Sequence, residues 1–483
     1  MAHVPLPGAD QPAVVAAREL TRRPVAPDRA ELTYSDLPAG VEHVLATLAD
    51  AGHEAVLVGG AVRDHLLGLA PGTWDWDAAT SATPEQVAAL FPSSTWENRF
   101  GTVTVRGVPP VEVTSFRAEG AYRDARRPDD VRFGVSLHED LARRDFTINA
   151  IAWVPLDLAA RRGRLVDPAG GVDDLERRTL RTVGDPRARF GEDALRLVRA
   201  ARLAAGFDLA LEEQTEAAAR DLAPTAAGIS GERIRDELSR ILGIPERPSR
   251  GLLLLEDLGL LLVVLPELAA LRGIPQEKRA PGDALDHTFA AVDAVPPGAP
   301  GDARLAALLH DLGKATTLAD GHFIDHEVVG ARLARQVLER LRFARARTDR
   351  IVAAIEQHMY NYEPEWTDAA IRRFVRRLSD VDRDLLFALR RADNAASGVG
   401  EAGERNQQEL ERRIEAELEQ QPDLLLGRRL ALDGNDLQEI LGLEPGPELG
   451  ELLDRLSEAA LDDPERNERD ALLALAREMI GER

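Results

Sequence analysis

The sequence has 483 residues, of which 44% are hydrophobic and 30% charged, with a net charge of −23 and no cysteine. A chain of this length exceeds one hydrophobic core and predicts three or more domains of a soluble globular protein. The missing cysteines exclude disulfides, a thiolate zinc site and a cysteine nucleophile, and the acidic balance disfavours a general nucleic-acid binder.

The N-terminal region shows no pattern typical of export. Residues 1–37 are rich in alanine, proline and arginine without periodicity, and we expect a mobile arm with no signal peptide. The most apolar run, residues 251–266, contains Glu256 and Asp257 and is shorter than the roughly 20 residues of a spanning helix. We therefore expect no membrane segment, and the lack of cysteine fits a cytoplasmic protein.

Helices and strands then alternate in a small mixed region. Residues 40–52 have apolar side chains at helical spacing and end in glycine, and residues 54–60 predict a buried strand. Residues 102–107 and 111–116 predict two strands joined by a short turn. Residues 120–134 are polar and contain glycine and proline, which predicts a long loop within this region.

Two glycines end the first strand directly before a helix. Gly59 and Gly60 would let backbone amides approach a phosphate beside the positive end of that helix. Arg63 lies one turn further and would complete a triphosphate clamp. Taken alone, the glycine pair fits a tight turn equally well.

Two carboxylates one residue apart follow. Side chains alternate across a strand, so Asp75 and Asp77 face one way while Trp76 packs on the other layer. Adjacent carboxylates repel each other unless cations lie between them, and such oxygen ligands suit Mg²⁺. Glu112, between two valines of a neighbouring strand, either faces the same site or lies on an ordinary polar face.

The order and spacing of these motifs resemble a known family. GGAVRD at residues 59–64, followed by WDWDAATSATPEQV at 74–87, resembles the head of class II tRNA nucleotidyltransferases and bacterial poly(A) polymerases, within the polymerase-beta-like superfamily. The resemblance implies that Asp75 and Asp77 bind the catalytic metals. ARRDFTINA at 142–150 resembles the second motif of that family. It implies that three side chains hold the ribose and triphosphate: Arg144, Asp145 and Asn149.

A locally basic region follows the head. Residues 191–207 predict one helix in which Asp193 and Arg196 share a face, a spacing typical of an intrahelical ion pair. A carboxylate and a guanidinium can also imitate a Watson–Crick edge, because one accepts from an exocyclic amine and the other donates to the ring. With Glu192, the pattern resembles the nucleotide-selecting motif of the family, which implies that Asp193 and Arg196 recognise cytosine or adenine.

Histidines and aspartates recur across the helical second half. Imidazole and carboxylate side chains from several helices can bind one or two transition metals, although surface histidines and a capping aspartate are the alternative. HDLGK at 310–314 resembles the HD metal-dependent phosphohydrolase domain. That resemblance implies a divalent transition metal and leaves hydrolytic activity open. The implied ligands are His287, His310, Asp311 and Asp393, with His326 and His358 matching the extra histidines of binuclear members.

These patterns predict a multidomain α+β protein. A small nucleotidyltransferase head with a mixed sheet and helices would precede an all-α neck, body and HD domain. The expected boundaries are an arm at 1–37, the head at 38–165, the neck at 166–225, an RNA-binding body at 226–282, the HD domain at 283–400 and a helical tail at 401–483.

The resemblance implies an RNA nucleotidyltransferase. It would add C, C and A to the 3′ end of tRNA from CTP and ATP with Mg²⁺, releasing pyrophosphate. A poly(A) polymerase or a CC-only or A-only enzyme shares these motifs. By the resemblance, the long 120–134 loop favours complete CCA addition, and the HD domain favours a tRNA enzyme over a poly(A) polymerase. A different alternative is an HD phosphohydrolase with an RNA-binding head, which the intact Asp75 and Asp77 disfavour. We predict no protein partner.

Overall fold

The computed structural model describes residues 31–69, 75–96, 101–119, 131–276, 282–319, 322–425 and 430–481. Within these ranges the chain forms two compact units. The first comprises residues up to 196 together with 208–219, and the second comprises 197–207 together with 220–483. Most of the predicted arm and most of the predicted 120–134 loop lie outside the described residues.

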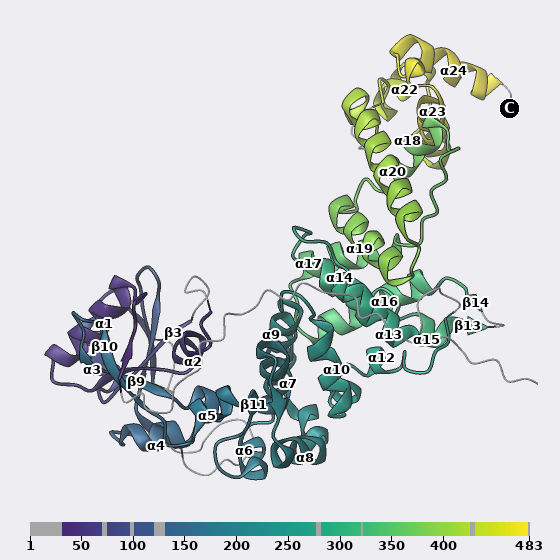
Figure 1. Ribbon diagram of the computed structural model, residues 1–483. Coiled ribbons are helices and arrows are strands. Elements are labelled where there is room, and N and C mark those ends of the chain that lie inside the picture. The colour runs from purple at the N-terminus through teal and green to yellow at the C-terminus, as the bar shows by residue number, and fades with distance from the viewer. Residues whose placement is uncertain are drawn as a thin grey trace, which may run out of the picture. The chain divides into compact units, whose positions relative to one another are not determined.

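The first unit contains an eight-stranded mixed sheet in the order β1-β10-β9-β2-β3-β6-β5-β4 (Figure 1). Strands β3 and β6 pair in parallel, and the other neighbours in this sheet pair antiparallel. The strands are β1 (Leu32–Thr33), β2 (Ala55–Val58), β3 (Trp76–Thr80), β4 (Thr95–Trp96), β5 (Thr102–Val105), β6 (Val111–Ser115), β9 (Ala152–Asp157) and β10 (Arg162–Val166).

Helices cover this sheet because each has one apolar stripe. In α1 (Ala39–Asp50) the buried side chains follow the helical spacing expected from the sequence. Helix α3 (Pro84–Leu90) begins at a capping box, in which Thr83 and Gln86 exchange hydrogen bonds. The remaining helices are α2 (Gly60–Leu66), α4 (Leu137–Ala142), α5 (Gly171–Glu176), α6 (Pro186–Glu192) and α8 (Glu213–Leu222).

Two short strands correct the sequence prediction. Residues 31–37 were expected to belong to the mobile arm, but β1 pairs with β10, and the fully buried Tyr34 donates a hydrogen bond to the Ala61 carbonyl at 2.6 Å. Residues 131–133, expected within a loop, form β8 and pair with β7 (Arg117–Glu119). Strands of two or three residues are too short to show an alternating pattern, so tertiary pairing decides them.

The second unit is helical, apart from a two-stranded pair, β13 (Leu318–Ala319) and β14 (His322–Phe323). The prediction of a mixed-sheet head followed by a helical body is therefore confirmed. The helices are α9 (Gly231–Leu242), α10 (Ser249–Asp257), α11 (Leu261–Val264), α12 (Pro266–Ala269), α13 (Ala284–Asp293), α14 (Ala303–Leu309), α15 (Lys314–Thr317), α16 (His326–Arg340), α17 (Arg345–Glu356), α18 (Asp368–Arg377), α19 (Arg383–Ala396), α20 (Glu401–Gln420), α21 (Pro422–Leu425), α22 (Gly434–Leu441), α23 (Pro447–Asp462) and α24 (Arg469–Gly481). Helix α7 (Leu195–Phe207) connects the two units.

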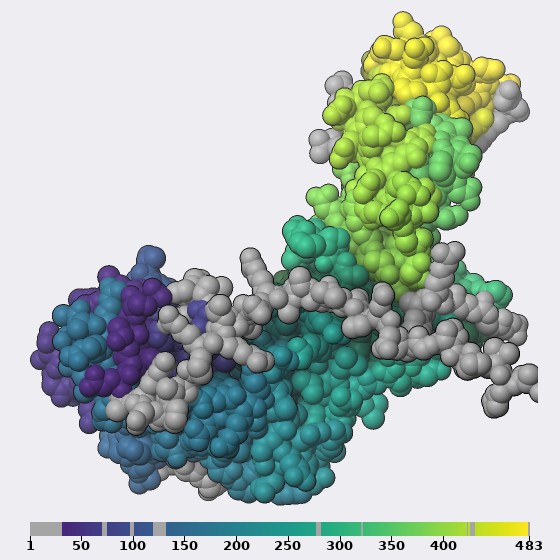
Figure 2. All heavy atoms as spheres, viewed as in Figure 1, coloured from purple at the N-terminus to yellow at the C-terminus, as the bar shows by residue number. Residues whose placement is uncertain are grey.

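The C-terminal helices pack around a leucine-rich core, and they form the yellow end of the chain in the space-filling view (Figure 2). The buried Arg372 of α18 joins three helices. Its guanidinium donates to both carboxylate oxygens of Glu417 on α20 at 3.1 Å, and to the carbonyls of Leu461 and Asp462 on α23 at 2.6 and 2.9 Å. Across the described ranges, no helix combines the length and apolar composition needed to cross a membrane.

Candidate functional site

The turn between β2 and α2 lies against two predicted site residues. Gly59 has φ 71°, a backbone conformation that side chains disfavour. A Cβ atom at this position would lie 3.3 Å from Asp77 Oδ2 and 3.4 Å from Arg144 Nη1. Glycine is therefore required here both by the backbone and by the close approach of a carboxylate and a guanidinium.

The carboxylates lie on adjacent strands. In the pairing of β3 with β6, Asp77 stands opposite Glu112, so the two side chains share a face of the sheet. Asp75 immediately precedes β3 and is exposed, Asp77 is half-buried, and Trp76 between them is 3% exposed. Asp77 and Glu112 therefore offer carboxylate oxygens on one face of the sheet, with Asp75 directly before β3, and such oxygens suit a hard divalent cation.

A chain of hydrogen bonds connects the glycine turn to the second motif. Arg63 is buried on α2, and its Nη1 donates to Asn149 Oδ1 at 2.6 Å while its Nε donates to Asp64 at 2.8 Å. Asn149 in turn donates to Asp145 Oδ1 at 3.2 Å. Three of the predicted nucleotide-binding residues, Arg63, Asp145 and Asn149, are thus brought together around one polar cluster.

Asp140, which the sequence analysis did not single out, anchors the arginines of this motif. Its fully buried carboxylate accepts from Arg143 at 2.6 Å and from Arg144 at 3.2 Å. Burial acts to raise the pKa of Asp140, but the guanidinium groups of Arg144 and Arg143 outweigh it and hold the pKa below its ordinary value. The spacing of three and four residues on α4 was a usable sequence signal.

The single helix predicted over 191–207 is wrong. Helix α6 ends at Glu192, Asp193 is extended at φ −149°, and α7 begins at Leu195. Asp193 Oδ1 accepts from the Leu195 amide at 3.0 Å, because an aspartate carboxylate competes with the helical backbone for such donors. The amide of Arg196 still donates to the Asp193 carbonyl at 3.0 Å, which keeps these two residues adjacent.

The six predicted metal ligands of the second unit converge in one buried cluster, here called the histidine–aspartate cluster. His287 Nε2 lies 3.1 Å from Asp393 Oδ1, and His310 Nε2 lies 3.1 Å from Asp311 Oδ2. Each member is 6% exposed or less. The members are His287 on α13, His310 and Asp311 after α14, His326 on α16, His358 after α17 and Asp393 on α19.

The orientation of the imidazoles fits a metal site. In His310, His326 and His358, Nδ1 lies 2.6 to 3.0 Å from the carbonyl oxygen three residues earlier. The Nε2 atoms of the same rings are buried without a hydrogen-bond partner. A ring fixed through Nδ1 with an unused Nε2 is the arrangement that protein metal sites use.

Distances and protonation agree with this orientation. The donor atoms of His287, His310 and Asp393 lie within 4.8 Å of one another, as do those of His310, Asp311 and His358. In the part of the chain that the structure describes, these are the two groups of three such donors. Burial and the neighbouring His310 lower the pKa of His358 to about 3, which keeps this ring in the neutral form that binds metals.

The glycine of the HDLGK motif, Gly313, is required by a close backbone contact. A Cβ atom there would lie 2.1 Å from the carbonyl oxygen of His326, so only glycine allows the first turn of α16 to approach. The buried Lys314 also belongs to this region, because its Nζ lies 2.6 Å from Asp311 Oδ2 and 2.9 Å from Gln276 Oε1. The sequence motif includes this lysine but did not predict its contacts.

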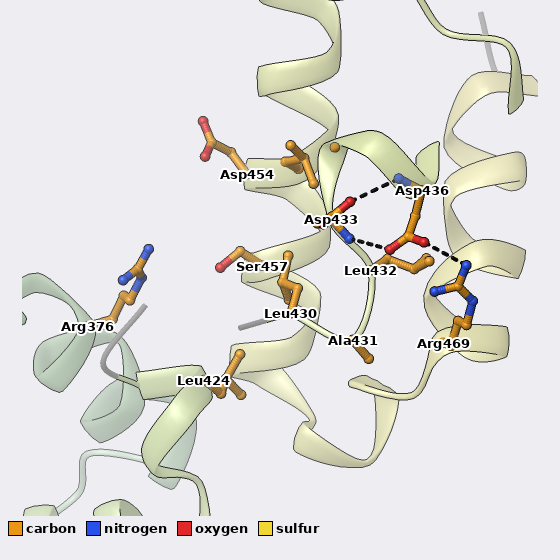
Figure 3. Close-up of a pocket in the computed structure, with 12 residues that line it drawn as sticks. Arg376, Leu424, Leu430, Ala431, Leu432, Asp433, Asp436, Asp454, Ser457 and Arg469 are labelled. Carbon is orange, nitrogen blue, oxygen red and sulfur yellow. Dashed lines mark hydrogen bonds and ion pairs between the residues drawn. The ribbon is translucent and has the colours of Figure 1, made fainter. Parts of the chain in front are cut away.

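A cavity of about 560 Å³ lies among the C-terminal helices and contains none of the predicted site residues (Figure 3). On its wall, at the start of α22, the backbone amides of Asp433 and Asp436 each donate to the carboxylate of the other, and Arg469 donates to Asp436 at 2.6 Å. These polar groups complete a helix cap, so the cavity wall is explained by local structure.

Comparisons with known proteins agree with the order of these parts. Three family profiles match the chain: the Poly A polymerase head domain at residues 55–181, the Probable RNA and SrmB-binding site of polymerase A at 208–271, and the HD domain at 284–397.

The similar proteins and solved structures include A-adding and CCA-adding enzymes, which match over different shares of this chain. An A-adding tRNA nucleotidyltransferase of Deinococcus radiodurans is 37% identical over 84% of this chain and 91% of its own length. A CCA-adding enzyme of Geobacillus kaustophilus is 47% identical over 47% of this chain, which spans about half of that relative (54%). The crystal structure of the Bacillus stearothermophilus CCA-adding enzyme in complex with CTP has 32% identity and a TM-score of 0.66, covering 91% of this chain and 96% of that one.

Proposed function

Because this chain belongs to the tRNA nucleotidyltransferase family of CCA-adding and A-adding enzymes, we propose that it adds C, C and A to the 3′ end of tRNA from CTP and ATP. The observation that carries the proposal is the position of Asp77, opposite Glu112 on one face of the sheet and against the glycine turn at Gly59. A transferase needs metal-binding carboxylates and a phosphate-binding turn at one place, and the closeness of Asp77 to Glu112 and to Gly59 supports this assignment.

In the head, Asp75 and Asp77 would hold divalent cations, for which Mg²⁺ is the natural choice, with Glu112 supporting them. Two such cations, when bound, assist loss of the proton from an attacking hydroxyl and stabilise a departing pyrophosphate. The residues of the chain direct the reaction by placing the RNA 3′-hydroxyl in line with the α-phosphate, and their contribution is orientation.

The nucleotide would lie over the glycine turn. Backbone amides at Gly59 and Gly60 approach the phosphates, and the positive charge of Arg144 beside Gly59 favours the same anion. The polar cluster of Arg63, Asp145 and Asn149 presents donors and acceptors suited to the ribose and triphosphate.

Base selection is assigned to the neck. Asp193 can accept from the exocyclic amine that cytosine and adenine share, and Arg196 can donate to the ring acceptors. Uracil and guanine present the opposite polarity at the amine position, so this pair would disfavour them.

The test uses three tRNA transcripts that end before CCA, after C and after CC, each supplied with labelled CTP or ATP and Mg²⁺. Complete CCA addition that then stops is the expected result. In Asp77→Asn, addition should fall about 1,000-fold, since several kcal/mol of charge stabilisation are lost. Asp50→Asn, an exposed substitution at the end of α1, is the matched control. Failure of the native protein to extend any transcript would reject the proposal.

A-only addition is the second candidate, because the Deinococcus radiodurans relative that the chain covers over 91% of its length is an A-adding enzyme. The same transcripts separate the two functions. Extension of the CC-ending transcript alone would establish A-only addition, and long A tails would establish a poly(A) polymerase.

In the second unit, the histidine–aspartate cluster would bind one or two divalent transition-metal ions. The buried Nε2 atoms of His310, His326 and His358 support this assignment. Metal analysis of the purified protein should find bound metal in the native chain and a loss of it in His310→Ala/His358→Ala. His322→Ala, an exposed histidine on β14, should retain the metal. Equal metal content in all three would contradict the assignment.

A further inference from the structure

The guanidinium of Arg189 on α6 joins segments that are distant in the sequence. Its Nη2 and Nη1 donate to the carbonyls of Ala142 at 2.9 Å and Arg143 at 3.0 Å, and its Nε donates to the Val183 carbonyl at 3.1 Å. Three converging carbonyls match the planar fork of an arginine, whereas a lysine ammonium cannot present donors in that plane. The side chain is 14% exposed, so these bonds are largely shielded from water.

The same guanidinium is connected to the proposed base-selecting arginine. Glu192 Oε2 accepts from Arg189 Nη1 at 2.9 Å and from Arg196 Nη1 at 2.5 Å. Arg196 Nη1 also donates to the Arg189 carbonyl at 2.8 Å, and its Nη2 lies 3.5 Å from the Arg143 carbonyl. Both guanidiniums therefore share the Glu192 carboxylate and the Arg143 carbonyl as partners.

Because the helix is broken at Asp193, these contacts determine how the start of α7 is oriented. Because α6 ends at Glu192 and α7 begins at Leu195, no continuous helical hydrogen-bond ladder fixes the first turn of α7 relative to α6. The bonds among Arg189, Glu192 and Arg196 span this break, and the bond from Arg189 to the Arg143 carbonyl ties it to the start of the second motif.

We propose that Arg189 is a positioning residue that sets the direction of the Arg196 guanidinium and thereby the choice of base. The inference rests on the proposed nucleotide transfer. Within the described residues, the hydrogen bonds of Arg189 go to Glu192 and to backbone carbonyls, and none reaches Asp75 or Asp77, so its loss should alter nucleotide selection more than phosphoryl transfer.

The experiment measures kcat and KM for CTP, ATP, UTP and GTP on the three transcripts. In Arg189→Ala and Arg189→Lys, discrimination against UTP and GTP should fall about tenfold, the equivalent of one charge-assisted hydrogen bond. The KM for the cognate nucleotide should rise while kcat changes by less than about threefold, because orientation of the base and not the reacting phosphate is affected. Arg187→Ala, an exposed substitution on the same helix, should leave the discrimination and the KM unchanged.

The Lys variant separates geometry from charge, since it keeps the cation and loses the fork. If Arg189→Ala does not accumulate as folded protein, Glu192→Gln gives the same measurement by removing the shared carboxylate charge. Unchanged discrimination in these variants, with or without a lower melting temperature or a lower kcat, would overturn the inference and leave the proposed transfer intact. Absence of any incorporation by the native protein would overturn both.

Discussion

Gly59 satisfies two requirements at once. Its φ of 71° is costly for other residues, and its Cα lies where a side chain would press on Asp77 and Arg144. Gly52 has a similar φ of 85° but has nothing within 4 Å of a Cβ atom. Substitution of Gly52 therefore tests the strain of the backbone alone, whereas substitution of Gly59 tests that strain together with displacement of the site residues.

Gly59→Ala and Gly52→Ala should each destabilise the protein by about 1–2 kcal/mol, because both force a left-handed conformation on alanine. Only Gly59→Ala should also lower kcat/KM, by on the order of 100-fold, since displacement of a carboxylate by a fraction of an ångström misplaces the reactants. Thermal unfolding and steady-state kinetics on both variants check this. Equal activity losses would contradict a specific role for the turn.

Asp140 predicts a pH dependence of stability. Its pKa is lowered in the folded state, so its contribution is present above the ordinary pKa of about 4 and is lost as pH falls through the folded value. Asp140→Asn should destabilise the protein at pH 7 by about 3 kcal/mol, because Arg143 and Arg144 lose a buried partner.

The free energy of unfolding of both proteins should be measured between pH 3 and pH 7. The difference between native and Asp140→Asn should shrink toward the acid end, whereas Asp50→Asn should show no such trend. A difference that stays constant with pH would mean that the carboxylate charge is not what stabilises this motif.

At the scale of elements, Arg372 predicts cooperative behaviour of the C-terminal helices. It bonds Glu417 on α20 and two carbonyls at the end of α23, so all three helices depend on one guanidinium. Arg376, one turn later on α18, lines the cavity of Figure 3, and its guanidinium makes no hydrogen bond or ion pair within the described part of the chain.

Arg372→Ala should increase opening of α23 by roughly 100-fold, as loss of about 3 kcal/mol from a buried ion pair implies. Arg376→Ala should have little effect. Hydrogen exchange over residues 447–462 provides the measurement. Similar exchange in the two variants would show that the contacts of Arg372 are not what holds α23.

The sequence predicted the elements in which a pattern of side chains repeats. It did not predict the places where the conformation of a single residue determines the structure. Helical spacing predicted α1, whereas strand alternation left Glu112 either beside Asp77 or on an ordinary polar face. The pairing of β3 with β6 places the two residues on one face. The break before α7 depends on the backbone choice of Asp193 alone, which no periodicity reveals.

The remaining failures have similar causes. Strand β1 is two residues long, and its existence depends on pairing with β10, more than 100 residues away in the chain. The connection from Arg189 to Ala142, Arg143 and Val183 was hidden because these partners are backbone carbonyls, which leave no residue-type signal in a sequence.

For the whole molecule, the candidate nucleotidyltransferase residues and the histidine–aspartate cluster belong to different compact units. The head residues through Arg196 lie in the first, and the histidine–aspartate cluster lies in the second. Domains with their own cores carry their own sites, so chemistry in one unit need not depend on metal in the other.

His310→Ala/His358→Ala should therefore lose bound metal yet retain nucleotide addition within about twofold, because removal of two ligands in the second unit leaves the core of the first unit intact. The transcript assay and metal analysis on one preparation check both halves. A loss of addition that parallels the loss of metal would reveal energetic coupling between the units.

The close approach at Gly313 bears on how such chains are compared across genomes. A glycine that is required because the first turn of α16 presses against it would be retained by a descendant whose histidines had been replaced and whose metal had been abandoned. Retention of that glycine therefore records ancestry of the fold, and the histidines record whether its chemistry survived.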